Sequence, residues 1–172
     1  FTARDVVNTY TQENLHKILG QYGELKNART AAQTIVTARS SSEIITINDL
    51  KSALQKILPR GKENKYLAQV FQALRIEVNE EMQALEEFLQ DTPKVLKPEG
   101  RLVVMSYHSL EDRLVKNFFR SGKFRGDVEK DFYGNDLKPL RALTRKPIEA
   151  SGEEVKVNPR ARSAKLRVAT LY

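Results

Sequence analysis

Four polar or aromatic side chains stand together directly after a short apolar stretch of the sequence. Leu102–Met105 is typical of a buried strand, and Ser106, Tyr107, His108 and Ser109 follow it before a predicted helix. Hydroxyl groups can orient a substrate by hydrogen bonding, and an imidazole can accept a proton near neutral pH. Ligands of α/β proteins bind beyond the carboxyl ends of the strands, so this turn is a candidate site.

The same turn has a structural interpretation. Ser109 with Asp112 three residues later is a good helix start, because both side chains can accept hydrogen bonds from free backbone N–H groups. That interpretation explains Ser109 and Asp112 without any function. Ser106 and His108 are not required by such a cap, so a functional role and a structural one stay equally open for them.

Composition excludes several kinds of site. The chain has no cysteine, which rules out disulfides, thiolate zinc sites and a cysteine nucleophile, and His16 and His108 alone make a histidine-built metal site unexpected. No apolar run is long enough to span a bilayer, and the first residues do not resemble a signal peptide. We therefore expect a cytoplasmic protein with no metal and no membrane partner.

Positive charge is concentrated near the C-terminal end. Residues 1–112 carry 14 Lys and Arg against 15 Asp and Glu, whereas residues 113–172 carry 15 against 7. An excess of this size is typical of a surface that binds a phosphate backbone, although a solubilising tail has the same composition. Phe124, Phe132 and Tyr133 lie among the basic residues, a mixture found both in loops that stack on unpaired bases and in ordinary ordered loops.

The pattern of apolar residues predicts two domains. Residues 1–62 are expected to form four short helices, of which the clearest begins at Thr46, because Asp49 follows at capping-box spacing. The loop after that helix is the predicted boundary, and residues 63–172 form the second domain.

Longer elements are expected in this second domain. Its helical pattern breaks at Asn79, and its later elements are a strand over 102–105, a helix over 110–120, a short helix near 152–157 and a closing strand over 166–171. This order indicates an α/β fold.

Three separated stretches resemble one family in the same order. They are FQALRIEVNEE, GRLVVMSYHSLEDRLVK, and LTRKPI followed by NPRARSAKLRVA. Together they resemble the C-terminal part of the RsmH (MraW) family of ribosomal RNA cytosine-N4 methyltransferases. The resemblance implies a partial class I, Rossmann-like methyltransferase fold with an all-α inserted domain that recognises substrate. It also implies methyl transfer from S-adenosylmethionine to N4 of a cytidine in the decoding region of small-subunit ribosomal RNA.

Two departures from the family pattern shape the expectation. The glycine-rich loop that holds the methyl donor has no counterpart here, because the eight glycines are scattered. We therefore expect a chain with no cofactor-binding residues of its own, whose donor is bound mainly by a segment that this chain lacks. The isolated chain is expected to be inactive. Tyr107 stands where the family more often has Phe, a change that keeps the aromatic ring.

The resemblance and the chemistry together nominate site residues. Ser106, His108 and Ser109 are the predicted catalytic group, which would orient the base and accept a proton. The predicted contacts with ribosomal RNA are polar or basic residues of the C-terminal stretches: Arg145, Lys146, Asn158, Arg160, Arg162 and Lys165. Exposed apolar surface could also favour a homo-oligomer. A non-catalytic, basic helical RNA-binding module is the competing interpretation.

Overall fold

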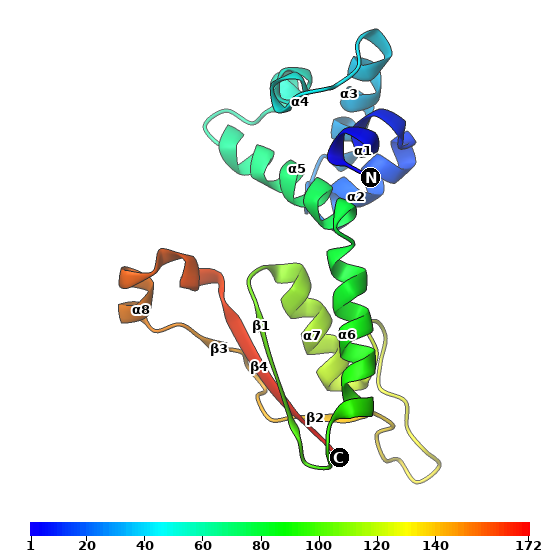
Figure 1. The fold of residues 1–172 in the computed structure, drawn as a ribbon, viewed down its shortest axis with the longest axis vertical. Coiled ribbons are helices and arrows are strands. Elements are labelled where there is room, and N and C mark those ends of the chain that lie inside the picture. Colours follow the sequence, from blue (N-terminus) through cyan, green and yellow to red (C-terminus); the bar gives the residue numbers. More distant parts are fainter. The chain divides into compact units, whose positions relative to one another are not determined.

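A computed structural model describes residues 1–172 and divides them into two compact units, Phe1–Glu81 and Met82–Tyr172. The first unit is entirely helical (Figure 1). Its elements are α1 (Ala3–Thr9), α2 (Gln12–Gln21), α3 (Ala28–Ser41), α4 (Ile47–Leu54), the short 3-10 helix η1 (Gln55–Ile57) and α5 (Glu63–Val78). No helix of the protein is both long and apolar enough to cross a membrane.

Local capping chemistry explains where these helices begin. At the start of α4, Thr46 Oγ1 accepts a hydrogen bond from the Asp49 backbone N–H at 3.2 Å, and Asp49 Oδ2 accepts one from the Thr46 N–H at 2.7 Å. This reciprocal capping box confirms the prediction made from the spacing. The pair Thr2 and Asp5 forms the same arrangement at α1.

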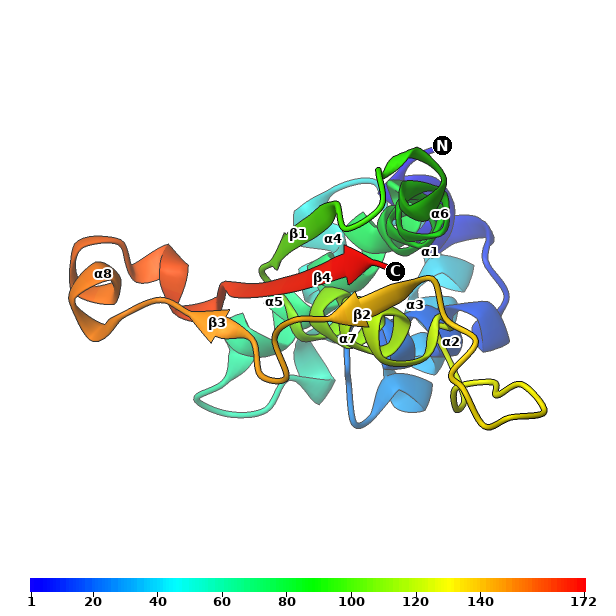
Figure 2. The ribbon, with the colours of Figure 1, turned by 90° about the horizontal axis from the view of Figure 1, so that it is seen from below.

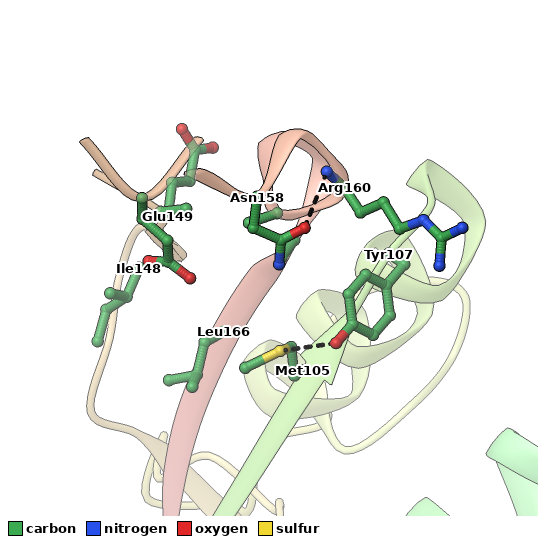
Figure 3. A pocket seen from close by; sticks show the side chains of 11 residues that line it. Met105, Tyr107, Ile148, Glu149, Asn158, Arg160 and Leu166 are labelled. Carbon is green, nitrogen blue, oxygen red and sulfur yellow. Dashed lines mark hydrogen bonds between the residues drawn. The ribbon is translucent and has the colours of Figure 1, made fainter. Parts of the chain in front are cut away.

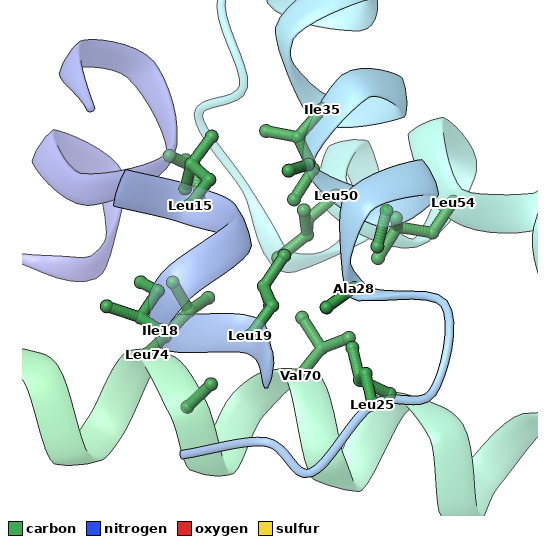
Figure 4. Close-up of a cluster of buried hydrophobic side chains, with 14 of the residues drawn as sticks. Leu15, Ile18, Leu19, Leu25, Ala28, Ile35, Leu50, Leu54, Val70 and Leu74 are labelled. Atoms are coloured by element: carbon green, nitrogen blue, oxygen red, sulfur yellow. The ribbon is translucent and has the colours of Figure 1, made fainter. Parts of the chain in front are cut away.

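The core of the helical unit includes one face of α5 (Figure 4). Leu67, Val70 and Leu74 are buried against residues such as Leu19 of α2. The predicted boundary at residue 62 therefore differs from the division in the structure, because α5 packs into the helical unit. The predicted break at Asn79 is confirmed, since α5 ends there and Glu80 adopts a left-handed φ of 51°.

One glycine lets α2 and α5 approach closely. A Cβ atom on Gly23 would lie 2.7 Å from the carbonyl oxygen of Leu19 and 2.9 Å from that of Gln69 in α5. Both neighbours are backbone atoms, so a larger residue would force the two segments apart.

The second unit packs helices against a small antiparallel sheet. Strand β4 (Lys165–Leu171) pairs with β1 (Arg101–Ser106), with β2 (Leu140–Ala142) and with the two-residue strand β3 (Ile148–Glu149). Figure 2 shows β1, β4 and β2 side by side. The remaining elements are α6 (Glu81–Val95), α7 (Ser109–Ser121), α8 (Gly152–Val157) and the 3-10 helix η2 (Pro159–Ser163).

The core of this unit lies between the sheet and its helices. Leu102 of β1 and Ala169 of β4 are buried with Phe118 and Phe119 of α7 and with Leu89 of α6. The strand predicted over 102–105, the helix over 110–120 and the closing strand over 166–171 are confirmed. The unit is thus a mixed helix-and-strand structure with an antiparallel sheet, which is consistent with the expected α/β class.

Candidate RNA-binding site at the ends of β1 and β4

The turn between β1 and α7 is held by His108. This residue is the N-cap of α7: its Nδ1 accepts a hydrogen bond from the Glu111 backbone N–H at 3.4 Å. In return, Glu111 Oε2 accepts hydrogen bonds from the N–H groups of Tyr107 at 2.8 Å and His108 at 3.3 Å. The cap expected from Ser109 and Asp112 is not the one that forms: α7 begins at Ser109, but His108 is its N-cap and Glu111 is its capping partner. The imidazole and Glu111 form the reciprocal cap that a hydroxyl and a carboxylate usually form.

The electrostatics of this cap centre on Glu111. Burial alone would raise the pKa of Glu111, but the His108 side chain and the backbone N–H of Tyr107 lower it to about 2. His108 Nε2 lies 3.2 Å from Glu111 Oε1, close enough for attraction but not aligned as a hydrogen bond. The carboxylate is therefore held ionised at the base of the turn.

The depressed pKa of Glu111 predicts acid-sensitive stability. The ionised Glu111 carboxylate contributes its full stabilisation when the pH is above the ordinary glutamate pKa of about 4.3. This stabilisation is lost as the pH falls through about 2. We expect Glu111→Gln to lower the melting temperature at pH 7, and the gap between variant and wild type to narrow between about pH 5 and pH 2. Thermal unfolding across this range measures the gap. A gap that stays constant with pH would contradict the assignment.

A pocket opens where β1 ends and β4 begins, with a volume of 510 Å³. Its apolar wall is formed by Met105, Tyr107, Ile148 and Leu166 (Figure 3). The Tyr107 residue is 58% exposed, and its hydroxyl donates a hydrogen bond to Met105 Sδ at 3.3 Å. An exposed aromatic ring beside apolar side chains is a suitable platform for a stacked nucleobase.

Polar groups line the other side of this Tyr107 pocket. Asn158 Oδ1 accepts a hydrogen bond from the Arg160 backbone N–H at 3.2 Å, which fixes the turn before η2. Asn158 and Arg160 both line the pocket together with the acidic residues Glu149 and Glu154. The pocket therefore offers amide, guanidinium and carboxylate groups beside an aromatic surface.

Only some of the residues predicted to contact RNA line the Tyr107 pocket. Asn158 and Arg160 line the Tyr107 pocket, whereas Arg145, Lys146 and Arg162 are exposed and do not line it. Lys165 begins β4, with its Nζ 3.8 Å from Asp112 Oδ2.

The predicted catalytic group lies in the turn but outside the pocket lining. Ser106 is 3% exposed and its Oγ donates a hydrogen bond to the Lys165 carbonyl oxygen at 3.3 Å. His108 caps α7, and Ser109 is the first residue of that helix. Tyr107, which was not among the predicted catalytic residues, is the member of this turn that reaches the pocket.

Comparison with known proteins identifies the family. The family model described as the MraW methylase family matches residues 1–171. The chain belongs to the MraW methylase family. It is 55% identical over 168 residues to the ribosomal RNA small subunit methyltransferase H of Cytophaga hutchinsonii, covering 98% of this chain and 56% of that protein. The corresponding protein of Parabacteroides distasonis is 54% identical, with 55% of its length covered. The chain therefore spans a little over half the length of these curated relatives.

A methylase of the MraW family needs a methyl donor, and the turn between β1 and α7 does not have the form that usually holds a nucleotide cofactor. Such a turn connects a strand to a helix through glycines that let the backbone approach the ligand closely. The turn between β1 and α7 contains no glycine, and Gly100 and Gly122 lie before β1 and after α7. We assign no donor-binding role to this turn.

One feature of this MraW chain was missed by sequence reasoning. Arg167 and Asp112 form a buried, bidentate ion pair, with Nε–Oδ1 and Nη2–Oδ2 distances of 2.7 and 3.1 Å. The two residues are 6% and 8% exposed. The pair joins the first turn of α7 to β4, and so ties the Tyr107 turn to the strand that follows the Asn158 turn. In the sequence, the signal for this ion pair is Arg167 itself, because a charged residue within an apolar strand needs a partner if it is buried.

Proposed function

We propose that the protein of which these residues form part methylates N4 of a cytidine in small-subunit ribosomal RNA, in the decoding region, with S-adenosylmethionine as donor. The observation that carries the proposal is the Tyr107 pocket. It joins Tyr107 with Asn158 and Arg160, which come from two separate stretches that resemble the family. The relatives' names, which give methylation of small-subunit ribosomal RNA, support the substrate class.

The pocket suits a base that has left its stack. Enzymes that modify a nucleobase usually extrude it into a pocket and read its hydrogen-bonding edge. In the proposed complex the Tyr107 ring stacks on the cytosine and the Asn158 amide meets its edge. The Arg160 side chain, which extends beside Tyr107 in Figure 3, contacts a neighbouring phosphate.

The cytosine amino group must be oriented and must lose a proton. Its lone pair is delocalised into the ring, so attack on the methyl group requires a fixed geometry and a proton acceptor. S-adenosylmethionine supplies the electrophilic methyl group when it is bound. We assign the role of proton acceptor to a glutamate that lines the pocket, Glu149 or Glu154. His108 is not assigned this role, because both of its ring nitrogens face Glu111. His108, acting through Glu111, is then a positioning residue for Tyr107, and a catalytic role of Ser106 and Ser109 stays a prediction.

Identification of the methylated nucleoside tests the proposed function. Small-subunit RNA from cells lacking the gene is incubated with the full gene product and S-adenosylmethionine, and digested nucleosides are analysed by mass spectrometry. We expect N4-methylcytidine at a single position. A methyl group on cytosine C5 or on ribose would contradict the assignment. RNA binding without any methylation would favour the non-catalytic RNA-binding module instead.

A further inference from the structure

The helical unit carries a second pocket with a different chemistry. It has a volume of 410 Å³ and lies between the turn after α2 and the first turns of α5. Three lysines line it: Lys26 from the turn, Lys62 at the N-cap of α5 and Lys65 in its first turn. Tyr66 lies beside them. The residues come from segments that are far apart in the sequence, so only the fold brings these charges together.

The three ammonium groups of this lysine pocket have no counter-ion. No carboxylate lies within ion-pair distance of Lys26, Lys62 or Lys65, and all three residues are exposed. By contrast, two arginines of the same unit are paired, Arg4 with Glu43 and Arg75 with Glu81, each at 2.8 Å. Cations around a concavity attract an anion most strongly when no neighbouring carboxylate pairs with them.

Acidic neighbours reduce this charge only in part. Glu24 lines the same pocket, and Glu63 accepts a hydrogen bond from the Gly61 backbone N–H at 2.9 Å. Two further cations, Lys56 and Arg60, belong to the segment that leads into α5. The local balance therefore stays positive, although the first 112 residues as a whole are nearly neutral.

The backbone beneath the lysines is fixed. Tyr66 is 7% exposed, and its hydroxyl donates a hydrogen bond to Asn27 Oδ1 at 3.0 Å, which ties α5 to the turn that carries Lys26. Gln72 Nε2 donates another from α5 to the Tyr22 carbonyl oxygen at 2.8 Å. Because Gly23 also packs directly on the backbone of α5, the turn that carries Lys26 and the start of α5 that carries Lys62 and Lys65 are held together before any ligand binds.

We propose that the lysine pocket binds phosphates of the RNA backbone, so that the helical unit docks the substrate through contacts that do not depend on base sequence. This inference rests on the proposed function, because RNA is the polyanion that a ribosomal RNA methyltransferase must hold. Phosphate contacts position an RNA without specifying its sequence. The lysine pocket therefore contributes to RNA affinity, and the chemistry at saturating RNA is independent of it.

The test removes the three charges and measures salt dependence. A triple variant of the full gene product carries Gln at Lys26, Lys62 and Lys65. Its binding to a small-subunit RNA fragment is measured over a series of KCl concentrations. Each lost phosphate contact lowers the slope of log affinity against log salt by about 0.7–0.9, so we expect the slope to fall by about two to three. Affinity near 0.1 M KCl is expected to fall by about tenfold, with kcat for methyl transfer at saturating RNA unchanged.

Matched variants separate this inference from general charge effects. The control is a triple variant with Gln at Lys17, Arg29 and Lys51, three exposed cations of the same unit that do not line the lysine pocket. We expect its salt slope to change much less than that of the test variant. Arg at the three pocket positions is expected to restore the slope. An unchanged slope in the Gln variant, or an equal change in the control, would overturn the inference while leaving methylation intact. Failure of the wild type to bind or methylate RNA would contradict the proposed function itself.

Discussion

Replacement of Asp112 by leucine is expected to remove about 3–5 kcal/mol from the free energy of unfolding of the second unit. The loss follows from Arg167, which is 6% exposed and makes two charged hydrogen bonds with the Asp112 carboxylate. Without the carboxylate, a guanidinium stays buried with no compensating charge. Urea unfolding, followed through hydrogen exchange of the β4 amides, measures the change in the unit that contains the pair.

A double replacement distinguishes the buried charge from a simple loss of contacts. In Asp112→Leu with Arg167→Met, the unpaired charge is absent, so the loss is expected to be much smaller than for Asp112→Leu alone. The exposed pair of Asp91 and Lys94, with an N–O distance of 2.6 Å, provides the control. Replacing Asp91 by leucine should cost at most about 1 kcal/mol. An equally small loss at Asp112 would show that the pair does not hold α7 to β4.

Features fixed by neighbouring residues were predicted correctly. The capping box of Thr46 and Asp49 depends on a three-residue spacing, and the break at Asn79 on a change in the apolar pattern. The closing strand predicted over 166–171 is likewise a local feature, and it corresponds to β4, Lys165–Leu171. Local periodicity and capping chemistry are sufficient for elements of this kind.

Features that depend on distant partners were not predicted. Asp112 has the right spacing for a helix cap, and only the packing of β4 against α7 shows that its carboxylate is bound by Arg167 instead. His108 was considered free of any capping role, because imidazole is not among the usual N-cap side chains. The structure makes it the cap, and this leaves Tyr107 as the residue of the turn that faces the pocket.

The resemblance in sequence identified the stretches that match the family, but the surroundings of each residue depend on packing. It nominated six polar or basic residues for RNA binding, and the pocket brings together two of them, Asn158 and Arg160. All six stay predictions, and Arg145, Lys146 and Arg162 would be surface contacts. Their chemistry is suitable, but which cations border a concavity depends on how β3, η2 and β4 meet, and this is set by tertiary packing.

The central claim is that the Tyr107 pocket receives the target cytosine. Base stacking on an aromatic side chain contributes about 1–3 kcal/mol, so Tyr107→Ala is expected to lower kcat/KM for RNA methylation by roughly ten- to a hundredfold. Tyr107→Phe keeps the ring and should retain activity within about threefold, because only the hydrogen bond to Met105 Sδ is lost. Since Tyr107 is 58% exposed, neither variant is expected to change the melting temperature appreciably.

The most direct test is therefore a comparison of kcat/KM for the wild type, Tyr107→Ala and Tyr107→Phe in the full gene product. Small-subunit RNA is the substrate, N4-methylcytidine is the readout, and the melting temperature of each protein is measured in parallel. We predict a large loss for alanine, near-normal activity for phenylalanine and similar melting temperatures for all three. An alanine variant with wild-type kcat/KM would show that the cytosine does not bind in this pocket.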